Sequence, residues 1–395
     1  MSDIRTVVDW LIDGAQSGPF SEDMMAELCR RMVDSGLPLW RVAVFVNTLH
    51  PEVLGRGFVW HADTGVTVSE ALYDMLETEE FRGSPVTAIR ASRQPIRRHL
   101  AMWNCPDDFP VVGELRAQGA TDYAALPLFF TDGSIHVVSW ATRQPGGFTS
   151  NQLVDIDRIV APLTRVTEIR ALRRTATNLL NTYVGRLAGE RILMGEIRRG
   201  HVEAIRAAIW LSDMRGFTAL SERLPPQELV DLLNRYFDCQ VPPILKHGGE
   251  VLKFIGDGLL AIFPLAPDGD PTACRRALTC AREARALIEA LDKAVGSEND
   301  IRFGLALHVG QVMYGNIGGG NRLDFTCIGP AVNLAARIEK VAARHGRSIV
   351  ASAEFAGHFP QEFTPLGEFD VSGFAAPQAV FGLADSSESA AASPS

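Results

Sequence analysis

Two aspartates in the second half of the chain stand beside glycines where apolar segments end. Asp213 follows the apolar run Ile205–Leu211, and Asp257 lies in a Gly-Asp-Gly sequence between two more apolar runs. Taken singly, Asp213 could be the N-cap of the next helix, and Gly-Asp-Gly is a common turn. As a pair at two strand ends, they have the composition that a two-metal phosphoryl-transfer site requires.

The segment that follows Asp213 favours phosphate binding. Met214–Thr218 turns at Gly216 and leads into a helix. Backbone N–H groups at a helix start can bind phosphate oxygens. A carboxylate beside a phosphate repels it unless a divalent cation lies between them, so this segment points to a metal-bound nucleotide.

A second polar pair lies on a predicted helix, Pro330–Arg344. Asn333 and Arg337 are four residues apart, so they share a face of that helix. Their neighbours in the sequence are apolar, which indicates a polar ligand or a partner for this face. The alternative is a surface salt bridge made by Arg337.

In chain order, these three pieces resemble class III adenylyl and guanylyl cyclases over about residues 190–384. The resemblance implies that Asp213 and Asp257 hold two Mg²⁺ or Mn²⁺ ions per active site, with the carbonyl of Met214 as a further ligand. It implies that Asn333 orients the ribose and that Arg337 stabilises the transition state at the α-phosphate. The residues that match the phosphate-binding turn are Gly216, Phe217 and Thr218.

Lys253 and Thr326 match the purine-selecting pair of the same family. A Lys donor, with a Thr hydroxyl able to accept, suits N1 and the N6 amino group of adenine. Cyclases that use GTP have Glu where Lys253 stands, so the resemblance implies ATP as substrate, with a guanylyl cyclase as the alternative. Thr326 replaces the commoner Asp and resembles a bacterial subset of the family.

The family builds each active site from two protomers, and this chain contains both sets of residues, which implies a homodimer. One position departs from the family. The segment Asp370–Phe374 has no Lys where a phosphate-binding Lys is often found, and Arg215 is a candidate substitute. A catalytically weak cyclase fold that acts as a dimeric signalling module therefore stays open as an alternative.

The elements around these motifs alternate between strands and helices over residues 201–384, which predicts an α/β catalytic domain with a ferredoxin-like βαββαβ core. The predicted strands are 205–211, 251–255, 259–263, 302–309, 312–316, 348–351 and 379–383, and the predicted helices are 226–239, 272–292 and 330–344.

The first half of the chain predicts a regulatory module. Residues 1–36 are expected to be helical with a break at Gly18-Pro19, and residues 37–165 resemble GAF-type sensor domains (α+β), chiefly through a hairpin around Asp132-Gly133. The resemblance implies an unidentified small-molecule ligand or signal. His50 and Cys105 are interpreted as structural residues rather than haem or metal ligands.

Residues 150–200 are predicted to form a helical connector. Apolar residues recur every three or four positions from Ile156 to Leu187, Thr149 and Gln152 have capping-box spacing, and Pro162 predicts a kink or break. Such a connector could pair in parallel with that of a second chain.

Composition limits the other possibilities. The chain has 395 residues, 46% of them hydrophobic and 22% charged, with a net charge of −9, which disfavours nucleic acid as a partner. The six cysteines form no CxxC pair, and no apolar run is long enough to span a membrane. With no signal peptide recognised, we expect a cytoplasmic protein with a disordered tail at residues 385–395.

Overall fold

The structure is a computed structural model that describes residues 3–18, 21–266, 271–296, 301–320 and 322–384. The chain divides into two compact units, Met1–Leu179 and Leu180–Ser395. Each unit is described separately below. Two features predicted from the sequence, the tail at 385–395 and Pro19, lie outside the described residues.

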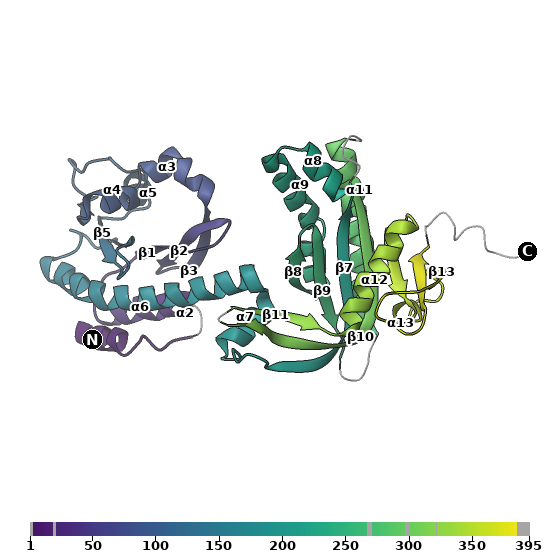
Figure 1. The fold of residues 1–395 in the computed structure, drawn as a ribbon. Coiled ribbons are helices and arrows are strands. Elements are labelled where there is room, and N and C mark those ends of the chain that lie inside the picture. The colour runs from purple at the N-terminus through teal and green to yellow at the C-terminus, as the bar shows by residue number, and fades with distance from the viewer. Residues whose placement is uncertain (1–2, 19–20, 267–270, 297–300, 321, 385–395) are drawn as a thin grey trace, which may run out of the picture. The chain divides into compact units, whose positions relative to one another are not determined.

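The first unit is built on a six-stranded antiparallel sheet with the order β3-β2-β1-β6-β5-β4 (Figure 1). Its strands are β1 (Arg41–Asn47), β2 (Val53–His61), β3 (Gly65–Leu72), β4 (Ile96–Arg98), β5 (Asp122–Phe129) and β6 (Ile135–Thr142). Its helices are α1 (Ile4–Ile12), α2 (Ser21–Asp34), the 3-10 helix η1 (Tyr73–Glu77), α3 (Glu79–Arg82), α4 (Pro85–Ser92), α5 (Pro110–Ala117) and α6 (Ser150–Val184).

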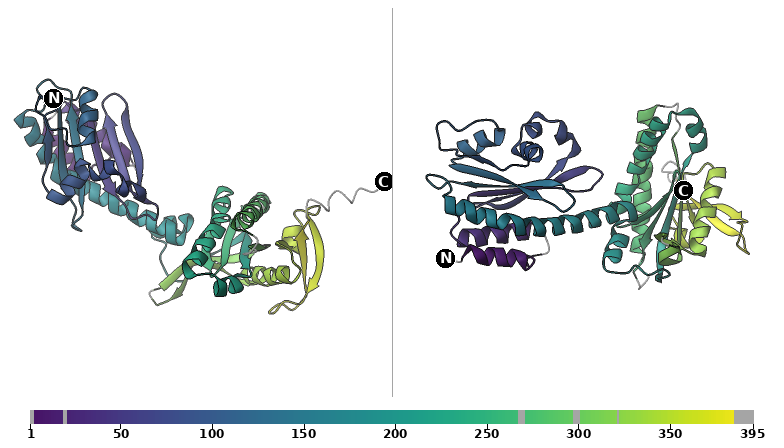
Figure 2. Two further views of the ribbon diagram at one scale, coloured as in Figure 1. Left: turned by 90° about the horizontal axis from the view of Figure 1, so that it is seen from above. Right: turned by 60° about the vertical axis from the view of Figure 1, so that its left-hand side comes forward.

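Helices cover both faces of this sheet. Residues of α1, α2 and the first half of α6 pack with β1 in one apolar cluster, whereas α4 and α5 pack with β5 and β6 in another. Figure 2 shows the resulting layers, with the sheet between the two sets of helices. The first unit is therefore an α+β domain, as expected.

The long helix α6 begins as predicted but continues past the expected kink or break. Thr149 N–H donates to Gln152 Oε1 at 2.9 Å and Gln152 N–H donates to Thr149 Oγ1 at 3.3 Å, which confirms the capping box. The predicted break at Pro162 is wrong, because α6 stays helical from Ser150 to Val184. The helix ends instead at Gly185, whose φ of +93° favours glycine, and α7 (Arg186–Leu193) follows.

The second unit is built on an eight-stranded sheet with the order β13-β14-β12-β10-β7-β9-β8, and β11 pairs with β10. Its strands are β7 (Val202–Arg215), β8 (Glu250–Ile255), β9 (Gly258–Pro264), β10 (Arg302–Gly319), β11 (Arg322–Ile328), β12 (Ile349–Ser352), β13 (Phe363–Phe369) and β14 (Gln378–Leu383). Its helices after α7 are α8 (Phe217–Arg223), α9 (Pro226–Asp238), α10 (Val241–Lys246), α11 (Thr272–Val295), α12 (Pro330–Arg344) and α13 (Ala353–Ala356).

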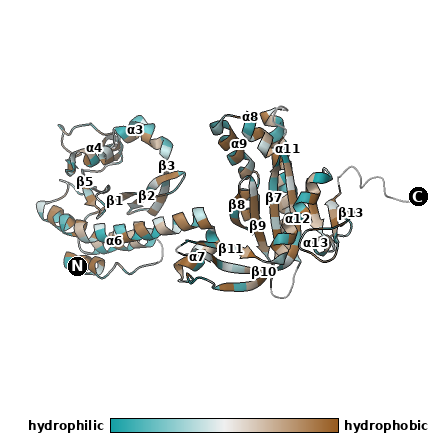
Figure 3. Ribbon diagram, viewed as in Figure 1, coloured by the Kyte–Doolittle hydropathy of each residue, from teal (hydrophilic) through white to brown (hydrophobic). Residues whose placement is uncertain are grey.

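The core of this unit confirms the predicted ferredoxin-like arrangement. Helices α9 and α11 pack on one face of the sheet against Trp210, Phe263 and Phe303, and α12 packs on the other against Ala306 and Val350. Figure 3 shows that hydrophobic residues run along β7 and β9, the strands at the centre of this core. These two strands end beside the candidate site.

One prediction about this sheet is wrong. Residues 302–309 and 312–316 were expected to form two separate strands, but β10 runs through both without a break. A Cβ atom on Gly310 would lie 2.5 Å from the Cβ of Ala331 on α12. The glycine therefore permits close packing of α12 on the strand and does not form a turn.

Candidate active site

Asp213 lies near the end of β7, a central strand held between β9 and β10. Its neighbour Met214 is buried in the core, and Asp213 points to the opposite face because side chains alternate along a strand. The strand end is anchored by the buried Ser212 hydroxyl, which donates to Gln240 Oε1 at 2.6 Å. Asp213 itself is half-buried.

Asp257 is brought beside Asp213 by a tight hairpin. Ile255 pairs with Gly258, so Gly256 and Asp257 form a two-residue turn between β8 and β9. Gly256 has a φ of +62°, which the first position of such a turn demands. A Cβ atom on Gly258 would lie 3.0 Å from the backbone oxygen of Ser212, so this glycine lets the turn approach the end of β7.

The two carboxyl groups interact directly. Burial, together with a hydrogen bond and the charge of Asp257, raises the pKa of Asp213 to about 7, against the lowering effect of Arg215. Two carboxylates this close cannot both ionise without a compensating cation. A bound divalent cation would remove this repulsion, so the pair fits a metal site on its own chemistry.

The protein donors at this place are few. Among the described residues, no group of three or more His, Cys, Asp and Glu side chains could hold a metal ion. Mg²⁺ is commonly held by one or two carboxylates together with waters and substrate phosphates. Asp213 and Asp257 therefore fit a cation whose remaining ligands come from water or a bound molecule.

The raised pKa of Asp213 predicts a stability effect that can be measured without metal. Between the ordinary pKa of 3.8 and about 7, the folded protein binds more protons than the unfolded chain, so the free energy of unfolding falls as pH rises. At pH 8 the free energy of unfolding is therefore lower by about 1–2 kcal/mol, after a discount for the partial solvent exposure of Asp213. We therefore expect Asp213→Asn to raise the metal-free urea midpoint at pH 8 but not at pH 4.

The control for this prediction is Asp63→Asn, which changes an exposed aspartate near the β2–β3 turn. It is expected to leave the urea midpoint unchanged at both pH values. If Asp213→Asn and wild type showed the same dependence of the midpoint on pH, the proposed interaction between the two carboxyl groups would be wrong.

The turn after Asp213 forms as predicted. Gly216 has a φ of +75° and precedes α8, and its carbonyl accepts from Leu220 N–H at 3.1 Å. Phe217 packs against the main core, which fixes the start of α8, and Thr218 is exposed. The backbone of Gly216, Phe217 and Thr218 thus follows directly on the carboxylate pair.

Lys253 lies on β8 and Thr326 on β11, two strands that are not paired with each other in the sheet. Lys253 is half-buried, and its Nζ lies 3.7 Å from Oδ2 of Asp324. Thr326 is 3% exposed, and its hydroxyl has no hydrogen-bond partner among the described residues. A buried hydroxyl without a partner is costly unless a ligand or water satisfies it.

Asp324 was not identified from the sequence. It stands two residues before Thr326, so both side chains belong to the same face of β11. That spacing was the available signal, but the ion pair with Lys253 depends on the approach of β8 and β11, two strands far apart in the sequence that are not paired with each other.

Asn333 and Arg337 are both exposed on α12. Within the part of the chain that the structure describes, neither side chain makes a hydrogen bond or ion pair, so the alternative of a surface salt bridge from Arg337 finds no partner here. Among the described residues, no hydrogen bond or ion pair joins Asn333 or Arg337 to Asp213 or Asp257. The structure thus brings the two aspartates together. It separately brings Lys253 close to β11, the strand that carries Thr326. Asn333 and Arg337 face outward.

Arg215 is engaged elsewhere in the protomer. Its Nη2 lies 2.8 Å from Oε1 of Glu339 on α12, and the two side chains are 17% and 8% exposed. An arginine already paired with a buried carboxylate is poorly suited to replace a phosphate-binding lysine. The segment Asp370–Phe374 lies between β13 and β14 and contains no cationic residue.

Comparison with known proteins gives the class. Residues 202–383 match the family model described as the adenylate and guanylate cyclase catalytic domain. Adenylate cyclase 1 of Rhizobium meliloti (strain 1021) is 29% identical over 242 residues, which cover 57% of this chain and 36% of that protein. Adenylate cyclase of Anabaena cylindrica is 32% identical over 216 residues, covering 49% and 41%.

A longer match extends over most of the chain. An uncharacterized protein of Mycobacterium tuberculosis is 32% identical over 391 residues, covering 87% of this chain and 70% of that protein. Among solved structures, the adenylyl cyclase CyaB from P. aeruginosa is 28% identical with a TM-score of 0.43, covering 47% of this chain and 97% of that one. The guanylyl cyclase Cya2 is also 28% identical, with a TM-score of 0.41, covering 46% and 93%.

The chain belongs to the class III adenylate/guanylate cyclases, and its catalytic domain occupies residues 202–383. It spans only 36% and 41% of the lengths of the two named adenylate cyclases. In the described residues, no helix is both long enough and apolar enough to cross a membrane.

Proposed function

We propose that this protein is an adenylate cyclase that converts ATP into 3′,5′-cyclic AMP and pyrophosphate. The choice of ATP rests on the surroundings of Lys253 and Thr326. A lysine donor lies beside β11, where the buried hydroxyl of Thr326 has no partner among the described residues. Adenine offers an acceptor at N1 for the lysine and a donor at N6 for the hydroxyl.

The chain's own residues provide the rest of the site. Asp213 and Asp257, with the carbonyl of Met214, would hold two Mg²⁺ or Mn²⁺ ions. When bound, these ions would lower the pKa of the ribose 3′-hydroxyl and offset the charge on the leaving pyrophosphate. The backbone amides of the turn at Gly216–Thr218 would hold phosphate oxygens.

In the reaction, the ribose 3′-oxygen loses its proton and bonds to the α-phosphorus, and the bond from that phosphorus to the β-phosphate oxygen breaks. Asn333 would hydrogen-bond the ribose and keep the 3′-oxygen in line with the leaving group. Arg337 would donate to the α-phosphate oxygens as charge accumulates there. Both side chains are exposed and therefore available to a nucleotide held by a second protomer.

A homodimer follows if each active site takes residues from two protomers. One protomer would supply Asp213 and Asp257, and its partner would supply Lys253, Thr326, Asn333 and Arg337, which gives two sites per dimer. The second half of α6 is consistent with pairing between two chains. Its apolar residues Ile169, Leu172 and Tyr183 are 66%, 60% and 79% exposed, whereas Ile156 and Leu163 on the same stripe are buried.

The first unit is proposed as a GAF-like regulatory domain that responds to an unidentified small molecule, with residues 150–200 as the connector to the catalytic domain. A six-stranded sheet covered by helices on both faces supports that proposal. Ligand-dependent movement of the connector would change how the two catalytic halves meet.

The choice of ATP is tested by Lys253→Glu. We expect this change to lower kcat/KM for ATP about 10²-fold or more, because a carboxylate faces the N1 acceptor where a donor is needed. Activity with GTP, measured in the same preparation by separating the cyclic products, should fall less or rise. Lys246→Glu, which alters an exposed lysine on α10, is the control and should leave both rates unchanged.

A guanylyl cyclase would give the reverse result, with GTP preferred by the wild type and Lys253→Glu without effect on that preference. The alternative is a cyclase fold that acts as a signalling module and does not turn over ATP. Two observations favour it: the segment Asp370–Phe374 has no cationic residue, and Arg215 is paired with Glu339. It predicts nucleotide binding but no cyclic product from the wild-type protein under any metal.

A further inference from the structure

The ion pair between Arg215 and Glu339 joins the two parts of the catalytic machinery within one protomer. Arg215 stands two residues after Asp213 on β7, and Glu339 stands two residues after Arg337 on α12. The guanidinium lies 2.8 Å from the Glu339 carboxylate, and its Nη2 also donates to the Glu339 backbone oxygen at 3.4 Å. Both side chains are largely buried, so solvent screens the pair weakly.

The strand beside β7 is shaped to keep Arg215 in this place. Gly304 on β10 pairs with Asp213, and a Cβ atom on Gly304 would lie 2.3–2.5 Å from the guanidinium of Arg215. Glycine at this position therefore lets the arginine lie flat across β10 on its way to α12.

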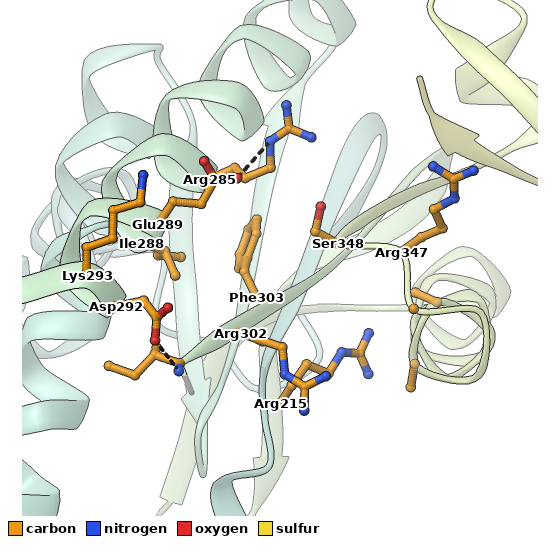
Figure 4. A pocket seen from close by; sticks show the side chains of 14 residues that line it. Arg215, Arg285, Ile288, Glu289, Asp292, Lys293, Arg302, Phe303, Arg347 and Ser348 are labelled. Carbon is orange, nitrogen blue, oxygen red and sulfur yellow. Dashed lines mark hydrogen bonds and ion pairs between the residues drawn. The ribbon is translucent and has the colours of Figure 1, made fainter. Parts of the chain in front are cut away.

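A cavity of about 340 Å³ opens on the other side of Arg215. Figure 4 shows Arg215 beside Arg302 in the wall of this cavity, and the two residues are register partners on β7 and β10. If its carboxylate partner were removed, Arg215 could turn towards this space and reach solvent. A variant that breaks the pair is therefore expected to fold.

The two faces of α12 point to different places. Asn333 and Arg337 are exposed, whereas Glu339 is buried and faces Arg215. Two residues along a helix correspond to a rotation of about 200°, so Arg337 and Glu339 necessarily lie on nearly opposite sides. The helix thus presents one pair of residues outward and fastens its inner side to the end of the strand that carries Asp213.

We propose that Arg215 and Glu339 are positioning residues that couple the two active sites of the homodimer. The inference rests on the proposed function, in which Asp213 of one protomer serves one site while Asn333 and Arg337 of that protomer serve the other. The pair fixes α12 relative to Asp213, so a displacement at one site is transmitted to the other. Neither residue is proposed to touch the nucleotide.

The test uses heterodimers with a single working site. Chains carrying Asp257→Ala and chains carrying Arg337→Ala are given different affinity tags, co-expressed, and purified through both tags. The only complete site takes its aspartates from the Arg337→Ala chain and its Asn333 and Arg337 from the Asp257→Ala chain. Glu339→Gln is then introduced into one chain or the other.

Coupling predicts that Glu339→Gln lowers kcat about 10-fold in either placement, with little change in the KM for ATP, because alignment of the reacting groups is disturbed from both sides. A role confined to the aspartates would lower kcat only when the change is in the Arg337→Ala chain. A role confined to α12 would lower it only in the Asp257→Ala chain. An effect in one placement alone, or in neither, would overturn the proposal.

Two further variants make the result specific. Glu362→Gln removes the carboxylate of the more exposed pair with Arg282 and should leave kcat unchanged in both placements. Gly304→Ala displaces Arg215 while both charges remain, and should reproduce the effect of Glu339→Gln in both placements, which keeps the test valid if Glu339→Gln unfolds the protein. A parental heterodimer without activity would refute the shared-site arrangement itself, and the coupling would fall with it.

Discussion

Asp257→Ala is expected to lower the turnover of ATP about 10³-fold while the protein stays folded and dimeric. Asp257 stands in a two-residue turn beside Asp213, where the paired carboxylates are the protein side chains proposed to hold the metals. Removing one of them leaves too few ligands to bind two cations and to neutralise the leaving pyrophosphate. The measurement is the rate of cyclic AMP formation at saturating Mn²⁺.

Stability should change in the opposite direction. Because Asp257 raises the pKa of Asp213 through a hydrogen bond and its charge, its removal relieves a repulsion in the metal-free protein. The urea midpoint should therefore stay the same or rise at pH 8. Asp63→Ala, at another hairpin, is the matched control and should retain full turnover. Undiminished cyclic AMP production by Asp257→Ala would show that the metal assignment is wrong.

Arg337→Ala is expected to lower kcat about 10²–10³-fold, because its guanidinium is proposed to stabilise charge that develops at the α-phosphate only in the transition state. The KM for ATP should change much less. Arg337 has no partner in the described part of its own protomer, so loss of the side chain should not affect folding. Steady-state kinetics on the purified variant, with its unfolding midpoint, separates these effects.

Complementation makes this second prediction specific to a shared site. Isolated heterodimers of Asp257→Ala and Arg337→Ala chains should regain about half of the wild-type specific activity, because one of two sites is complete. The matched control mixes Asp213→Ala with Asp257→Ala chains, in which neither site is complete, and should stay inactive. If the first heterodimer were as inactive as its parents, each site would have to be built within one protomer.

The elements that carry the proposed site residues were predictable because their signals are local. A carboxylate at a strand end, a glycine in a two-residue turn and two polar residues four apart on a helix are patterns that the backbone alone imposes. The elements that carry them form where the sequence indicates, as β7, the β8–β9 turn and α12.

The features that the sequence did not predict depend on tertiary neighbours. Residues 302–309 and 312–316 were expected to be two strands, whereas Gly310 lies within the single strand β10 and permits close packing of Ala331. In the sequence, Glu339 cannot be distinguished from other acidic residues on an amphipathic helix, because its ion pair with Arg215 forms only in the folded protein. Asp324 likewise acquires its interaction with Lys253 only when β11 and β8 come together. Side-chain partners across a sheet are set by register, which local patterns do not specify.

The end of the connector helix also depends on a tertiary neighbour. The apolar repeat continues past Val184 to Leu187, so periodicity alone predicted one helix through this point. The structure places the end at Gly185 with a left-handed backbone, where a Cβ atom would lie 3.2 Å from the Val251 carbonyl on β8. Close contact with a strand some 65 residues away in the sequence thus requires the glycine.

The most direct test of the central claim is product analysis of the full-length protein given ATP or GTP in equal concentration, first with Mg²⁺ and then with Mn²⁺. We expect 3′,5′-cyclic AMP and pyrophosphate in equal amounts from ATP, with much less cyclic product from GTP. Preferential formation of cyclic GMP, or nucleotide binding without any cyclic product under either metal, would contradict it.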